Sequence, residues 1–186
     1  MNIYSKPDCT NPSILKQIQQ GAVFISPTDT IYGLSCDATN NIAVERIRNI
    51  KQRPTQPLSI WAPNKEWIIK NCRMTTKSKK WLDKLPGPYT LLLTLKDTAA
   101  LAPNVICGQT TIGVRIPDHW FSGVVKKINI PLITTSANIH SEPHMTSLET
   151  LNPLVKSQVD FIIYEGEKTA RPSTIVDVEK DTTIKR

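Results

Sequence analysis

Short apolar segments alternate with amphipathic ones along the chain. Seven of the apolar segments are rich in β-branched and aromatic residues and have the length of buried strands, and turn-forming residues bound most of them. These predicted strands span 22–26, 58–62, 89–95, 111–116, 132–135, 160–164 and 173–178. Helical patterns separate only some of them, so we expect an α/β fold with a twisted, mixed parallel and antiparallel sheet and flanking helices.

Helical patterns occur at 12–20, at 40–51, in a segment after 64, at 77–85 and at 118–127. Asn40 or Asn41 can cap the second of these helices, and prolines stop it so that Lys51 and Arg53 lie at its end. Asp118 is expected to cap the last helix. The outward-facing side of the second helix is expected to hold Glu45, Arg46, Arg48 and Asn49.

Length and composition indicate one folded domain spanning residues 1–186. Apolar residues make up 39% of the chain and charged residues 21%, which is ordinary for a globular protein. The longest apolar stretch, 89–95, is far shorter than the roughly 20 residues of a membrane-spanning helix, and no secretory signal is visible. We therefore expect a cytoplasmic protein without membrane contact.

The net charge of +7 makes an anionic partner plausible. Seven basic residues gather in one stretch, namely Lys65, Lys70, Arg73, Lys77, Lys79, Lys80 and Lys84. This stretch is either a solvated helical face or a surface that faces nucleic acid.

Familiar signatures of metal and nucleotide sites are absent from the sequence. The four cysteines form no C-x-x-C pair, so we expect reduced thiols and no metal site. Neither G-x-x-x-x-G-K-[ST] nor G-x-G-x-x-G occurs. Instead, four polar clusters lie beside predicted strands, at 26–34, 51–59, 111–117 and 134–138. Because loops at strand ends assemble sites on sheet scaffolds, we expect a composite pocket.

Several residues of these clusters suit anions or small polar ligands. Lys51 and Arg53 can turn toward one anion where their helix ends, or can simply stabilise the helix dipole. Arg115 lies in an apolar strand and needs a negative partner, which is either an internal carboxylate or a ligand carboxylate. Ser136 and Asn138 can fix a polar ligand or cap a turn.

Taken together, the clusters resemble the YrdC-like family of L-threonylcarbamoyladenylate (threonylcarbamoyl-AMP) synthases, in its short single-domain bacterial type. The motifs that carry the resemblance are S-P-T-D-T-I-Y-G-L at 26–34, K-Q-R-P at 51–54, P-G-P-Y-T-L-L-L at 86–93, T-I-G-V-R-I-P-D-H at 111–119, T-S-A-N at 135–138 and P-S-T-I-V-D at 172–177. They occur in family order from about residue 15 to the end. The resemblance implies a YrdC-like sheet with a basic concave pocket.

The resemblance also implies a reaction. Members of this family combine L-threonine, bicarbonate or CO2, and ATP into threonylcarbamoyladenylate and pyrophosphate, with Mg²⁺ accompanying ATP. The product feeds a separate transferase complex that modifies the adenosine next to the tRNA anticodon. Weak tRNA binding by this chain would be compatible with the reaction.

Family positions assign roles to individual residues. The paired motifs K-x-R and S-x-N fall on Lys51, Arg53, Ser136 and Asn138, of which Lys51 and Arg53 are the expected catalytic residues. The expected threonine contacts are Thr30, Arg115, Ser136 and Ser173. The expected ATP contacts are Lys51, Arg53, Gln56, Thr111, Asn138, Thr146 and Arg186.

The chain departs from the family pattern in three places. The segment between Arg53 and Leu58 is one residue shorter than in many members, and Trp61 stands where some members have a histidine near threonine. Ala170, Arg171 and Pro172 replace a glycine-rich run before Ser173. The alternative function is a non-enzymatic RNA-binding or ribosome-assembly protein, which would use the basic stretch and would not need the Arg115 and Ser-x-Asn clusters.

Overall fold

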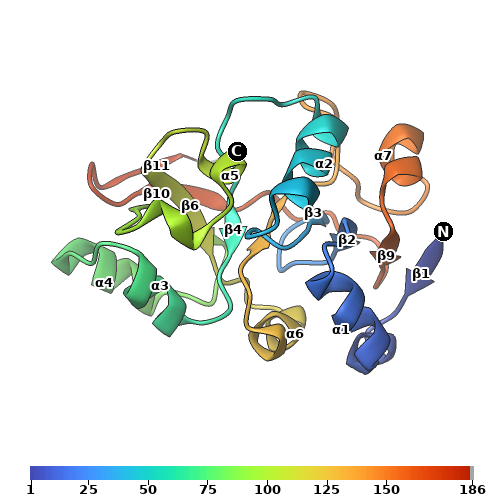
Figure 1. Cartoon of the computed structure of the whole chain (residues 1–186), viewed down its shortest axis with the longest axis horizontal. Helices are drawn as coiled ribbons and strands as arrows, with labels where there is room; N and C mark the ends of the chain where they lie inside the picture. Colours follow the sequence, from blue (N-terminus) through green and yellow to red (C-terminus); the bar gives the residue numbers. More distant parts are fainter. Residues whose placement is uncertain (185–186) are drawn as a thin grey trace.

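A computed structural model describes residues 1–184, and their hydrogen-bonded strands form two mixed sheets (Figure 1). The first sheet has the strand order β1 (Asn2–Tyr4), β9 (Phe161–Ile163), β2 (Phe24–Ser26), β3 (Gly33–Ser35) and β8 (Thr135–Ser136). Strand β9 is parallel to both β1 and β2, whereas β3 is antiparallel to β2 and β8. The expected mixture of strand directions is therefore confirmed.

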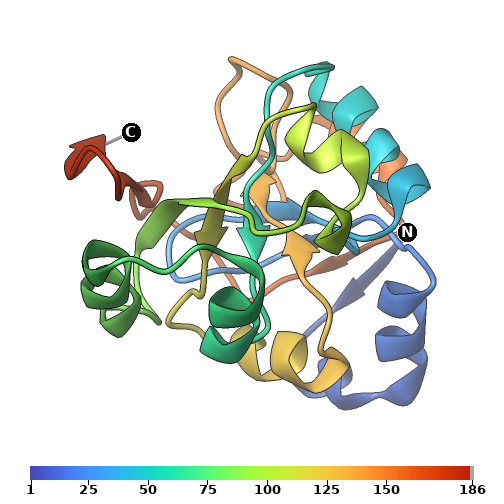
Figure 2. The same cartoon turned by 60° about the vertical axis from the view of Figure 1, so that its left-hand side comes forward.

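The second sheet carries most of the longer strands. Its order is β11 (Thr182–Ile184), β10 (Thr174–Asp177), β5 (Tyr89–Thr94), β6 (Thr111–Arg115), β4 (Ile60–Trp61) and β7 (Leu132–Ile133). The pairs β5/β10 and β4/β6 are parallel, and the other neighbours are antiparallel. Strands β10 and β11 form a hairpin that projects from the body of the molecule (Figure 2).

Thr134 marks the crossing between the two sheets. It separates β7, which belongs to the second sheet, from β8, which belongs to the first. Its amide N–H donates to the carbonyl of Ser59, 2.9 Å away, just before β4. One predicted strand, 132–135, is thus two short strands, and the change of sheet pairs Ser136, at the start of the Ser-x-Asn loop, with Gly33 of β3.

The described helices are α1 (Pro12–Gln19), α2 (Asn41–Lys51), α3 (Lys65–Asn71), α4 (Thr76–Asp83), α5 (Pro103–Ile106), α6 (Phe121–Ile128) and α7 (Pro153–Gln158), with short 3-10 turns η1 (Pro7–Thr10) and η2 (Thr98–Ala100). Helices α2 and α7 lie on one side of the molecule, and α1 and α6 on the other (Figures 1 and 2). The sequence pattern missed α5 and α7, which are too short to show a clear period. No helix within residues 1–184 has the length and apolarity needed to cross a bilayer.

Asp118 does not cap α6, which is a correction to the sequence prediction. The residue before this helix is Trp120, and no side chain caps the helix. The amide N–H of Asp118 instead donates to the Asp29 carboxylate at 3.1 Å. A tertiary contact has therefore replaced the expected local one.

Helix α2 ends where its sequence indicates. Asn40 is the cap, and its side-chain oxygen accepts hydrogen bonds from the backbone of Ile42 and Ala43. Gln52 ends the helix in the left-handed conformation, with a φ of 51°. Lys51 is the last helical residue and is buried, so α2 directs its ammonium group inward.

Trp61 belongs to an aromatic core. Its side chain is fully buried and packs edge-on against Phe121, with ring centroids 5.6 Å apart. Phe24 and Phe161 stack in the same cluster at 4.9 Å. The departure from the family pattern at position 61 thus contributes packing between β4 and α6.

Candidate active site

One cavity of about 400 Å³ lies where the loops predicted to form a site converge. This volume is within the range of small-molecule sites. It brings together several predicted site residues: Arg53, Thr111, Arg115, Ser136, Asn138 and Ser173. Lining residues for which sequence reasoning proposed no role include Tyr32, Ser59, Thr90, Gln109 and His144.

The cavity carries positive charge without a lining carboxylate. Arg53 and Arg115 line it, and its described lining residues include no Asp or Glu. Within the described part of the chain, no group of three or more His, Cys, Asp and Glu side chains could hold a metal ion. The cavity is therefore suited to anionic ligands, and its lining residues do not fit a protein-bound Mg²⁺ ion.

Lys51 lies behind the Ser136–Asn138 loop and is not one of the cavity-lining residues. Its Nζ atom is 2.7 Å from the Ser136 carbonyl, 2.9 Å from the Asn138 carbonyl, 2.8 Å from Asn138 Oδ1 and 3.4 Å from Ser136 Oγ. Burial, helped by the nearby charge of Arg53, lowers the pKa of Lys51 to about 7. The four oxygen acceptors favour the charged form and oppose this shift.

The Ser-x-Asn loop is fixed from several directions. Ser136 Oγ donates to Asn138 Oδ1 at 2.6 Å, and Asn138 Nδ2 donates to the Glu142 carbonyl at 2.5 Å. Because Lys51 also donates to Oδ1, the amide of Asn138 has one defined orientation. The loop therefore presents Ser136 and Asn138 to the cavity in a fixed arrangement.

Arg48 organises the segment that carries Arg53. Its guanidinium donates to the carbonyls of Arg53 at 2.8 Å, Gln56 at 3.0 Å and Asn104 at 2.6 Å. The prediction that Arg48 faces outward is wrong, because its exposed fraction is 2%. The carbonyls of an irregular, proline-containing loop need donors, and a buried guanidinium supplies several at once.

Gln56 and Thr146 do not join the predicted ATP contacts Arg53, Thr111 and Asn138 in the cavity lining. Gln56 has an exposed side chain, and neither Gln56 nor Thr146 lines the cavity. The backbone carbonyl of Thr146 accepts a hydrogen bond from the amide of Lys168 at 2.9 Å, and the amide of Thr146 donates to Thr150 Oγ1. Arg186 lies outside the described residues.

Arg115 has an internal carboxylate partner. Its Nη2 atom is 2.5 Å from Asp29 Oδ1, and the two side chains are 7% and 10% exposed. The same nitrogen donates to Thr30 Oγ1 at 3.4 Å. Arg115 also lines the cavity, whereas Thr30 contacts Arg115 without lining it. The internal carboxylate expected as one alternative is thus confirmed.

Ser173 is paired with Thr90 across the second sheet. Their hydroxyl oxygens are 2.8 Å apart, and the residues are 3% and 1% exposed. Gly113 lies next to this pair on β6, and a Cβ atom there would come within 2.6 Å of Ser59 Oγ and 3.0 Å of Thr90 Cγ2. A larger residue at this position would therefore force the side chain of Ser59 to shift and would crowd Thr90.

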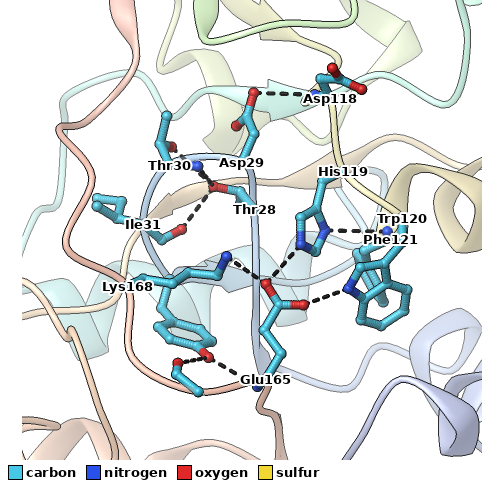
Figure 3. Close-up of polar contacts among 12 residues, drawn as sticks. Thr28, Asp29, Thr30, Ile31, Asp118, His119, Trp120, Phe121, Glu165 and Lys168 are labelled. Carbon is cyan, nitrogen blue, oxygen red and sulfur yellow. Dashed lines mark hydrogen bonds and ion pairs between the residues drawn. The ribbon is translucent and has the colours of Figure 1, made fainter.

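Glu165 joins two loops beside the cavity (Figure 3). Its carboxylate contacts His119 Nε2 at 2.8 Å, Trp120 Nε1 at 2.5 Å and Lys168 Nζ at 2.5 Å. Its amide donates to the Tyr32 hydroxyl at 3.0 Å. Burial disfavours ionisation of Glu165, but these hydrogen bonds outweigh burial and lower the pKa of its carboxyl group. No sequence motif indicated this cluster.

Comparisons with known proteins agree on one family. The family model Sua5/YciO/YrdC, described as telomere recombination, matches residues 16–186. A candidate threonylcarbamoyl-AMP synthase from Methanocaldococcus jannaschii is 38% identical over 173 residues, which are 91% of this chain and 80% of the relative. The threonylcarbamoyl-AMP synthase of Vibrio vulnificus is 29% identical over 181 residues, covering 93% of this chain and 96% of the relative.

A solved structure supports the same relationship. The crystal structure of P. abyssi Sua5 complexed with L-threonine superposes with a TM-score of 0.81 at 25% sequence identity. The match covers 98% of this chain and 55% of the other, so this chain spans about half the length of that protein.

Proposed function

This chain belongs to the Sua5/YciO/YrdC family, and from that membership we propose that it is a threonylcarbamoyl-AMP synthase. It combines L-threonine, bicarbonate or CO2, and ATP into L-threonylcarbamoyladenylate and releases pyrophosphate. One observation carries this proposal: Arg53 and Arg115, from separate loops and strands, line one cavity together with Ser136, Asn138 and Ser173. The reaction needs an anion-binding site that holds two substrates side by side.

Threonine is held on the Arg115 side of the cavity. The Arg115 guanidinium binds the threonine carboxylate, because a planar fork of N–H donors matches a carboxylate. Ser173 and Ser136 supply hydroxyl groups from two separate segments of the chain, and both line the cavity. Thr30 acts through its contact with Arg115.

ATP is held on the Arg53 side. Arg53, Thr111 and Asn138 line this part of the site and contact the nucleotide. Gln56, Thr146 and Arg186 are further proposed ATP contacts. Mg²⁺ enters with the triphosphate, and we assign it no ligand from this chain.

Catalysis depends on positioning and electrostatics. An oxygen of the threonine carbamate forms a bond to the α-phosphorus of ATP, and the bond from that phosphorus to the bridging oxygen breaks, so that pyrophosphate leaves with its electron pair. Negative charge that develops at the α-phosphate is stabilised by Arg53, while Lys51 supplies charge from behind the Ser136–Asn138 loop. No nucleophile from the protein is required.

The product passes to a transferase complex that modifies the adenosine next to the tRNA anticodon, in the cytoplasm. Weak tRNA binding by this chain is part of the proposal. The alternative, a non-enzymatic RNA-binding or ribosome-assembly protein, would use the basic stretch on α3 and α4. Neither of these helices contributes a residue to the cavity lining, so the two roles can be tested separately.

Labelled bicarbonate tests the proposal. The protein is incubated with ATP, L-threonine and ¹³C-bicarbonate. The nucleotide products are then separated, and their masses are determined by mass spectrometry. A threonylcarbamoyladenylate whose carbamoyl carbon carries the label is expected. An adenylate without the label, or none at all, would contradict the proposal.

A further inference from the structure

The loop between β2 and β3 holds Arg115 with consecutive residues. Asp29 and Thr30 both contact Arg115 Nη2. The hydroxyl group of Thr28 contacts that of Thr30 (Figure 3). Thr28 is 1% exposed, Thr30 4% and Arg115 6%. In such a buried group, the direction of each hydrogen bond matters, because a donor facing a donor cannot be relieved by water.

The hydroxyl of Thr28 fixes the direction of the Thr30 hydroxyl. Thr28 Oγ1 lies 2.8 Å from the carbonyl of Ile31, which can only accept, so Thr28 donates its single proton there. Thr28 Oγ1 must then accept in its other two contacts, from the Thr30 amide at 3.1 Å and from Thr30 Oγ1 at 3.0 Å. The hydroxyl proton of Thr30 therefore points toward Thr28.

This direction determines what Thr30 offers to Arg115. With its proton directed at Thr28, Thr30 Oγ1 presents lone pairs to Arg115 Nη2, 3.4 Å away. The two hydrogens of Nη2 are thus directed at Thr30 and at Asp29 Oδ1. The second oxygen of Asp29 accepts from the Asp118 amide at 3.1 Å, so the carboxylate is itself held in place. The β2–β3 loop therefore fixes the Nη2 edge of the Arg115 guanidinium group.

We propose that Thr28 is a positioning residue for carboxylate recognition. By forcing Thr30 to accept a hydrogen bond, it keeps Arg115 in the orientation in which the guanidinium lines the cavity. The inference rests on the proposed function, in which Arg115 binds the threonine carboxylate. Thr28 affects threonine affinity through Arg115 and leaves ATP affinity unchanged.

Isosteric substitution separates the hydroxyl from the shape of Thr28. Affinities for L-threonine and for ATP are measured by calorimetry for the intact chain and for Thr28→Val and Thr28→Ser. We expect Thr28→Val to weaken threonine binding about tenfold while ATP affinity changes less than about twofold. Thr28→Ser keeps the hydroxyl and should restore threonine affinity to within about threefold. An equal loss for both ligands, or no rescue by serine, would overturn the inference.

Ser35→Ala controls for the loss of a buried hydroxyl away from the cavity, whereas Thr28 is itself one of the residues that line the cavity. Ser35 Oγ pairs with Ser26 Oγ at 2.8 Å on the same β2–β3 hairpin, and neither residue lines the cavity. Both Ser35→Ala and Thr28→Val should lower the melting temperature, but only the second should weaken threonine binding. If Ser35→Ala weakens threonine binding as much, the effect of Thr28 is general destabilisation and the inference fails.

A double-mutant cycle tests whether Thr28 acts through Arg115. The KM for threonine is measured for Arg115→Lys with and without Thr28→Val. If Arg115 transmits the effect, Thr28→Val should raise KM by less than about twofold in the lysine background. An undiminished tenfold increase in KM would show that Thr28 contacts threonine directly. This result would overturn the inference about Thr28 but not the proposed function. Failure of the unmodified protein to bind threonine would instead overturn the proposed function and this inference with it.

Discussion

The Lys51 ammonium group lies 2.8 Å from Asn138 Oδ1 and 2.9 Å from the Asn138 carbonyl, joining the end of α2 to the Ser-x-Asn loop. The two motifs that family resemblance pairs are thus in direct contact. In this arrangement, Lys51 reaches a bound nucleotide chiefly through its charge and through the loop. Arg53, in contrast, lines the cavity itself.

Removal of either cation should slow turnover. We expect Lys51→Ala and Arg53→Ala each to lower kcat at least about tenfold, which corresponds to about 1.4 kcal/mol of activation free energy. Initial rates of pyrophosphate release measure this effect, with circular dichroism as the check on folding. Variants that are slow only because they are unfolded would indicate a purely structural role.

The buried ammonium of Lys51 should also make stability depend on pH. Its folded pKa of about 7 lies below the ordinary value of 10.5, so between these values the unfolded chain binds a proton that the folded chain does not. The free energy of unfolding should therefore rise with pH in this window, by at most about 1.4 kcal/mol per unit. Denaturant titrations at pH 7 to 10 should show a shallower rise for Lys51→Met. Parallel curves would contradict the assignment.

The hydroxyl pair of Thr90 and Ser173 should support threonine binding. Thr90→Val keeps the shape of the side chain but removes the partner that lies 2.8 Å from Ser173 Oγ. We expect the KM for threonine to rise about fivefold, whereas Thr90→Ser should stay near the original value. Steady-state kinetics with ATP saturating checks this, and an unchanged KM in the valine variant would show that the pair does not orient Ser173.

Glu165 should stabilise the loops beside the cavity in a pH-dependent way. Glu165→Gln keeps the size of the side chain but removes the charge that faces Lys168 and His119, and should cost about 1–2 kcal/mol at neutral pH. Because the folded pKa of Glu165 is lowered from 4.5, its stabilising effect should be present above that value and lost as pH falls through the folded pKa. Thermal melts of both proteins from pH 7 to 3 should therefore converge. A constant difference would contradict this account.

Local pattern was sufficient for several features of the site. The apolar spacing, cap and terminating prolines of α2 correctly placed Lys51 and Arg53 at a helix end, because these signals act within a few residues. The isolated cation in an apolar strand correctly indicated that Arg115 needs a negative partner. These inferences depend on short-range geometry and on the cost of burying charge, and both can be judged from sequence.

Features that depend on long-range contacts could not be predicted. Arg48 faces inward because the carbonyls of Asn104 and of the 53–56 loop come within its reach, and the period of α2 alone gave no sign of this. Asp29 contacts Arg115, which is 86 positions away in the sequence, and Glu165 contacts His119, which is 46 positions away. The division of residues 132–135 between two sheets likewise depends on which neighbouring strands are available for pairing.

Omission of single substrates tests the central claim most directly. Pyrophosphate release from ATP is measured with L-threonine and bicarbonate together, with each alone, and with neither. The proposed reaction predicts release only when both are present, because the carbamate formed from them is the nucleophile. Release that continues at the same rate without threonine would contradict the assignment of this chain as a threonylcarbamoyl-AMP synthase.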